Sequence, residues 1–85
     1  MSAAADGLGA AVQAAADAMR AAIGAGQVVV PVSLNTDVIG PLPAGAHYVA
    51  QAEVTRRTRT MAFVAAEVSG DGAPALSASG VFRLS

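Results

Sequence analysis

A single carboxylate, Asp17, stands among alanines in the middle of the stretch from Leu8 to Ile23. A carboxylate in such a setting can activate water as a general base or attack an electrophile directly. We therefore expect Asp17 to be the residue that carries chemistry. The competing interpretation is a solvated helix residue that pairs loosely with Arg20, three positions further on.

Three arginines lie close together near the middle of the chain. Arg56, Arg57 and Arg59 supply three of its five basic residues. Guanidinium groups match the geometry of phosphate oxygens, so this basic turn is a candidate site for a phosphorylated ligand. It is equally compatible with an exposed turn whose charges pair in part with Glu53 or Glu67.

Other reactive side chains give no recognisable constellation. His47 is the only histidine, and the acidic residues do not cluster with it, so we expect a surface histidine and no metal site. The serines in the predicted strands have no histidine or acid at a suggestive spacing. The chain contains no cysteine, which excludes thiolate sites and disulfides and is compatible with the cytoplasmic location that we expect.

The element that must position Asp17 is a helix from Leu8 to Ile23. Its alanine content, its lack of proline and the spacing of its apolar residues all favour helix. Asp6 is a reasonable N-cap, and Gly24 with Gly26 offers the left-handed stop that ends many helices. At about 100° per residue, Asp17 lies roughly opposite the apolar stripe. That stripe consists of Leu8, Val12, Ala15, Met19 and Ile23.

After the glycines the hydrophobic period changes to two, which predicts strands over about residues 27–38, 46–57, 58–68 and 75–84. The first is expected to be half-buried, and Pro31 places it at a sheet edge or at a bulge. The residues expected on its apolar face are Val28, Val30, Val32, Leu34 and Val38. Loops are expected at 40–45 and 69–72, where glycine, proline and aspartate gather. One helix followed by a four-stranded antiparallel meander is an α+β order.

Length and composition limit the possible functions. Eighty-five residues make one domain, and with two Phe, one Tyr and no Trp its alanine-rich core is thin. We therefore expect association with another copy, as a dimer or tetramer, to supply part of the stability. A net charge of −1 argues against nucleic-acid binding, and no stretch is apolar enough to span a membrane or basic enough to target one.

Several short motifs occur in an order known from one family. The helix entry is Leu8-Gly9-Ala10, and Ala16-Asp17-Ala18-Met19 follows it in the same helix. A basic turn and a closing Ala-x-Gly-x-Phe-Arg-Leu pattern ending at Leu84 complete the set. Together these motifs resemble the hotdog-fold acyl-CoA thioesterases of the phenylacetic-acid-degradation and 4-hydroxybenzoyl-CoA types. In that family the helix entry is His-Gly-Gly-like, so Leu8 and Ala10 are departures.

The resemblance implies a curved antiparallel sheet wrapped around a central helix. It also implies hydrolysis of an acyl-CoA, with Asp17 as base or nucleophile, the Gly9 N–H as oxyanion donor, and the arginines at the nucleotide end of coenzyme A. Coenzyme A would enter as part of the substrate, with no separate cofactor. The family usually has a leading segment and a first strand before the helix, so residues 1–85 are expected to form a single, shortened hotdog domain.

The spacing of the two site residues has a geometric consequence. Eight residues at about 1.5 Å each separate Gly9 from Asp17 by roughly 12 Å along one helix, too far to act on one carbonyl. A working site would therefore combine Gly9 of one copy with Asp17 of another, at a subunit interface. The alternatives are a non-catalytic hotdog module that binds acyl-CoA or only oligomerises, and an unrelated all-β sandwich with a peripheral, exposed helix.

Overall fold

One helix, α1 (Leu8–Ile23), forms where the alanine-rich stretch predicts it. In the computed structural model, which describes residues 7–24, 26 and 28–85, the helix ends at Gly24. The φ angle of Gly24 is 97°, a left-handed value that glycine adopts readily, and its N–H donates to the carbonyl of Arg20. The N-cap is Gly7, which has no side chain to offer; the predicted Asp6 cap lies outside the described residues.

The helix packs one face against the sheet. Its buried residues recur every four positions, as one stripe facing the core requires. They are Ala11, Ala15, Met19 and Ile23. The predicted stripe is wrong at its first member, since Leu8 is 39% exposed. At that end α1 meets the 39–47 loop, where the Gly7 N–H donates to the Leu42 carbonyl.

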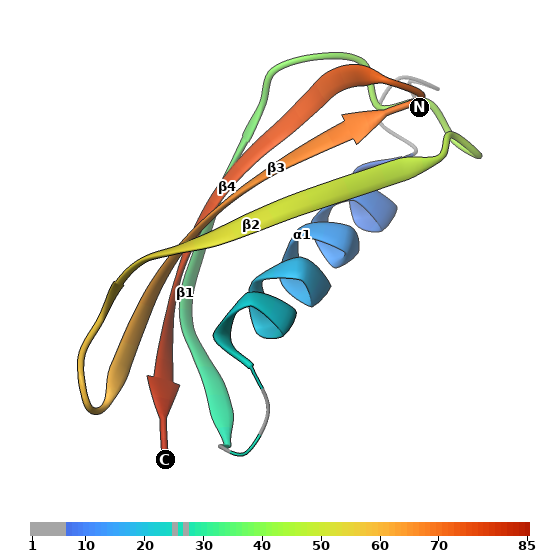
Figure 1. Cartoon of the computed structure of the whole chain (residues 1–85). Coiled ribbons are helices and arrows are strands. Elements are labelled where there is room, and N and C mark those ends of the chain that lie inside the picture. Colours follow the sequence, from blue (N-terminus) through green and yellow to red (C-terminus); the bar gives the residue numbers. More distant parts are fainter. Residues whose placement is uncertain (1–6, 25, 27) are drawn as a thin grey trace.

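Four strands form a single antiparallel sheet on one side of the helix (Figure 1). They are β1 (Val29–Val38), β2 (Tyr48–Arg57), β3 (Met61–Gly70) and β4 (Ala73–Leu84). Their spatial order is β1-β4-β3-β2, so the α+β class and the curved sheet are confirmed but the simple meander is wrong. The 39–47 loop carries the chain from one edge of the sheet to the other, which leaves β1 beside the last strand.

The core lies between α1 and the inner face of β2, β3 and β4. The predicted alternation of β4 is confirmed, because Leu76, Phe82 and Leu84 are buried while Ser79 and Arg83 are exposed. Gly80 belongs to the same inner face and leaves room for the side chains of Phe82 and Met19. Since one face of the helix is buried here, the all-β sandwich with a peripheral helix is excluded.

Strand β1 differs most from its prediction. It was expected to be half-buried, yet all of it after Val29 is exposed. A bulge between Pro31 and Ser33 explains part of the difference, because one extra residue turns the following side chains to the other face. Val30 therefore lies on the outer face opposite Arg83, while Leu34 lies on the inner face opposite Gly80. The edge position that Pro31 predicts is confirmed.

Candidate functional site

Asp17 lies on the exposed side of α1, away from the sheet, as its angular position predicts. Its hydrogen-bond partner is Gln13, whose Nε2 donates to the Asp17 Oδ1 over 2.8 Å. The alternative prediction of a pair with Arg20 therefore names the wrong partner. The residue that sequence reasoning missed is Gln13, although its i,i+4 spacing was a usable signal. The bond orients the carboxylate and still leaves its second oxygen for a further partner.

Gly9 lies in the exposed first turn of the same helix. The first amides of a helix have no intrahelical acceptor and carry partial positive charge, so they can donate to an anion. An added Cβ at Gly9 would meet no atom within 4 Å, so the surroundings of this turn are open. The structure thus keeps Gly9 accessible, but it does not bring Gly9 and Asp17 together within one chain.

Tyr48 fastens this end of the helix to the sheet. Its hydroxyl donates to the Pro43 carbonyl over 2.6 Å, and a Cβ added at Gly7 would overlap that hydroxyl. Partial burial and the nearby Asp71 carboxylate together raise the pKa of the Tyr48 phenol. The close packing of Gly7 against Tyr48 therefore fixes where the first turn, and with it Gly9, begins.

The three arginines do not form one cluster. A bulge between Val54 and Arg56 changes the phase of β2, so that Arg56 lies on the outer face opposite Phe63 and Arg57 lies on the inner face opposite Ala62. The Arg57 Nη1 donates to the carbonyl of Ile23, the last residue of α1, over 3.0 Å. A cation at this position stabilises the negative end of the helix.

Arg59 lies exposed in the turn between β2 and β3. The turn is closed by Thr58, whose N–H donates to the Met61 carbonyl over 2.8 Å. Arg56 and Arg57, by contrast, lie on opposite faces of the sheet. The expected phosphate site therefore cannot use all three guanidinium groups on one phosphate, because Arg56 and Arg57 project from opposite faces of the sheet.

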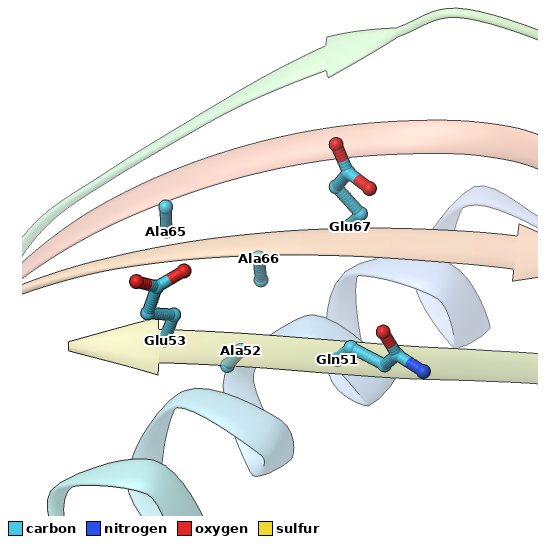
Figure 2. A pocket seen from close by; sticks show the side chains of 6 residues that line it. All are labelled: Gln51, Ala52, Glu53, Ala65, Ala66 and Glu67. Carbon is cyan, nitrogen blue, oxygen red and sulfur yellow. The ribbon is translucent and has the colours of Figure 1, made fainter. Parts of the chain in front are cut away.

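A shallow hollow of about 370 Å³ lies over β2 and β3 (Figure 2). Its exposed side chains, Gln51, Glu53, Ala65 and Glu67, belong to the outer face of the sheet, so the hollow is remote from Asp17. Its two carboxylates make it unsuited to the phosphates of a nucleotide. Over residues 7–24, 26 and 28–85, no three His, Cys, Asp or Glu side chains gather into a metal-binding group.

Within the described part of the chain, no helix has both the length and the apolar character needed to cross a membrane. His47 is exposed just before β2, where its backbone N–H donates to the Asp71 carboxylate over 2.9 Å. This bond ties the β3–β4 turn to the loop before β2 and gives His47 a structural environment at the surface.

Comparison with known proteins identifies the family. A family model described as the acyl-CoA thioesterase N-terminal domain matches residues 8–83. The chain belongs to this family. The match begins at the first residue of α1 and reaches nearly to the end of β4, so it covers the helix, the sheet and every candidate site residue. No curated protein matches the chain.

Solved structures show the same fold. The BH2602 protein from Bacillus halodurans, crystallised with CoA, is 22% identical with a TM-score of 0.80, over 91% of this chain and 57% of that one. A Pseudomonas aeruginosa protein is 18% identical with a TM-score of 0.76, over 88% and 60%. A Thermus thermophilus thioesterase complexed with coenzyme A and Zn is 18% identical with a TM-score of 0.59, over 65% and 42%.

These likenesses establish the hotdog fold, in which a curved antiparallel sheet wraps one helix, and they confirm the resemblance drawn from the motifs. This hotdog chain spans about 57% and 60% of the lengths of the first two structures that it matches.

Proposed function

We propose that this hotdog protein hydrolyses an acyl-CoA thioester to the free acid and CoA, at a site shared between two copies. The observation that carries the proposal is Asp17, an exposed carboxylate in the middle of α1 that Gln13 holds by one oxygen. Membership of the acyl-CoA thioesterase family supports this assignment, as does the CoA in the Bacillus halodurans structure.

The chemistry follows from these two helix features. As a general base, Asp17 takes a proton from water while the water oxygen bonds to the thioester carbon. The carbonyl oxygen becomes an oxyanion, which the Gly9 N–H of the other copy stabilises. Collapse of this intermediate breaks the C–S bond, and the CoA thiolate leaves and is protonated. As a nucleophile, Asp17 would instead form an acyl anhydride, which water then hydrolyses.

The roughly 12 Å between Gly9 and Asp17 along one helix is what requires two copies. The partner of this chain is therefore a second copy, in a dimer or a tetramer, and the substrate is a small-molecule acyl-CoA with no metal or separate cofactor. Arg56 and Arg59 are the residues assigned to the CoA phosphates. Arg57 contributes mainly by holding the end of α1, because its guanidinium already donates to the Ile23 carbonyl.

Thiol release from short-chain and aryl acyl-CoAs tests the proposal. We expect Asp17→Asn to lower kcat/KM by about 10²- to 10⁴-fold, the usual contribution of a general base. Glu53→Gln is the matched control, since it neutralises an exposed carboxylate on the outer face of the sheet and should leave the rate unchanged. Equal rates for wild type and Asp17→Asn would contradict the residue assignment.

A second candidate is a non-catalytic module that binds acyl-CoA or only oligomerises. The observation that favours it is Leu8, an exposed apolar residue where the resembling enzymes have a histidine at the helix entry. CoA binding measured by calorimetry separates the two. Binding that weakens in Arg56→Ala or Arg59→Ala, with no thiol released by the wild type, would support the module and overturn hydrolysis.

A further inference from the structure

The outer face of the sheet, which points away from α1, has one acidic end. Asp37 of β1 and Glu67 of β3 both lie opposite Ser77 of β4. Arg83 lies on the same face six residues further along β4, because side chains on one face recur every two residues. At about 3.3 Å per residue, roughly 20 Å separates the acidic end from Arg83. That distance is well beyond the screening length of about 8 Å at physiological ionic strength, so the two ends are electrostatically independent.

Basic side chains gather at the other end of this face. Arg83 lies opposite Met61, and Arg56 lies opposite Phe63, two residues further along β3. Arg59 is exposed in the turn between β2 and β3, at the end of the molecule where β4 also ends (Figure 1). The side chains of these three arginines make no hydrogen bond or ion pair with any residue that the structure describes. Their charges are therefore available to a partner.

Apolar side chains lie between these arginines. Met61, Phe63 and Val81 are half-buried on the outer face. Val30 lies opposite Arg83 on the edge strand and is 48% exposed. Cationic groups set around apolar ones are typical of protein surfaces that bind at a lipid–water interface, where phosphates and acyl chains meet. We call this surface, formed by Arg56, Arg59 and Arg83 around these apolar residues, the basic end of the outer face.

We propose that the basic end docks on an anionic lipid surface, with its guanidinium groups among the headgroup phosphates and Val30 at the interface. β3 lies between the strands of Arg56 and Arg83, and the two residues are offset by two positions, so their Cα atoms are about 12 Å apart. The arginines are thus spread over a surface and do not surround one point. Such an arrangement suits many phosphates in a plane better than it suits a single phosphate.

Folding is what creates this surface. No single stretch of the chain is basic enough to direct it to a membrane, and Arg83 joins Arg56 only through the register of β3 with β4. A net charge of −1 gives no general attraction to polyanions, but an anionic plane would still orient the molecule with its acidic end pointing away. A polyanion without acyl chains would leave Val30 in water, so the apolar residues favour lipid over nucleic acid or an acidic protein.

Tryptophan fluorescence tests the orientation, because the chain has no tryptophan of its own. Val30→Trp places the probe at the basic end. Val49→Trp is the matched control, since Val49 is 50% exposed on the same face but beside the acidic end. With vesicles of phosphatidylglycerol and phosphatidylcholine in equal parts, we expect the emission of Val30→Trp alone to move to shorter wavelength. Vesicles of pure phosphatidylcholine should shift neither variant.

Vesicle co-sedimentation measures the contribution of each charge. Arg83→Gln should lower the partition coefficient on the mixed vesicles about fivefold, the usual contribution of one basic residue at an anionic surface. Arg20→Gln is the matched control, because Arg20 is exposed on α1, on the other side of the sheet, and its loss should leave binding unchanged. Binding should also weaken in about 1 M salt, where the screening length falls to about 3 Å. If circular dichroism shows that Arg83→Gln fails to fold, Arg59→Gln in the exposed turn takes its place.

The outcomes are independent of thiol release, so failure of this inference can be told from failure of hydrolysis. Binding to the mixed vesicles that weakens in Arg83→Gln and shifts the emission of Val30→Trp supports the lipid surface. No binding to these vesicles overturns it, and so does an equal shift in Val49→Trp or an equal loss in Arg20→Gln. Equally tight binding to soluble heparin or polyglutamate also overturns it, because the basic end would then recognise charge without lipid.

Discussion

Arg57 offers a quantitative test of how the sheet holds the helix. Its Nη1 donates to the Ile23 carbonyl over 3.0 Å, which satisfies one of the last carbonyls of α1 with a positive charge. A hydrogen bond to a charged group contributes about 1.5–3 kcal/mol, and solvent weakens it here because Arg57 is largely exposed. We therefore expect Arg57→Gln to lower the free energy of unfolding by about 1–2 kcal/mol, or roughly 4–16 °C in Tm for a domain of this size.

Urea and thermal unfolding followed by circular dichroism measure this effect at one fixed protein concentration. Arg56→Gln and Arg59→Gln are the matched controls, since one side chain lies on the outer face and the other in the turn. Both should stay within about 0.5 kcal/mol of the wild type, as surface substitutions usually do. Arg57→Lys should recover part of the loss. The reasoning is refuted if Arg57→Gln is no less stable than Arg59→Gln.

Two further predictions concern packing and pH. Gly80→Ala should lower the free energy of unfolding by about 1–3 kcal/mol, because the new Cβ would lie 2.9 Å from Phe82 Cε1 and 3.0 Å from Met19 Sδ. Gly9→Ala is the control, because its new Cβ would meet no atom within 4 Å, and it should unfold no more easily than the wild type. Because the pKa of the Tyr48 phenol is higher in the folded state than in the unfolded state, the phenol loses its proton at lower pH when the chain is unfolded. The contribution of Tyr48 to the free energy of unfolding should therefore be fully present below about pH 10 and should fall as the pH rises further. Chemical denaturation from pH 8 to 11.5 should show this fall in the wild type and a flatter profile in Tyr48→Phe, which has no phenol to titrate; equal slopes would contradict it.

Much of the fold could be predicted because local patterns were strong. The alanine-rich helix and the alternation of β4 agree with the sequence, since each segment has one clear period. In β1 and β2, two bulges made the prediction from period-two alternation wrong. At Val32 and at Thr55 one extra residue moves the side chains that follow it to the opposite face of the sheet. Period-two alternation alone cannot show where such a residue falls. The pairing of β1 with β4 is a long-range choice, and the short loop between β1 and β2 suggested the wrong neighbour.

The candidate site was predictable in part for the same reason. The exposure of Asp17 follows from helical geometry alone, because it is opposite the buried stripe. The environment of Arg57 does not, because its place on the inner face depends on the bulge at Thr55. Leu8 was assigned to the core by periodicity, yet coverage at a helix end depends on the neighbouring loop. Gly9 and Asp17 can act on one carbonyl only if they come from two copies, and the residue pattern of one chain does not determine how two copies are arranged.

The order of the strands also determines when each can form during synthesis. β2, β3 and β4 follow one another through short turns, so each can pair soon after it is made. β1 is synthesised first among them but pairs with β4, the last, and so it must wait for nearly the whole chain. The most apolar edge of the sheet is therefore exposed for longest on the ribosome, where unpaired strands are prone to misassembly.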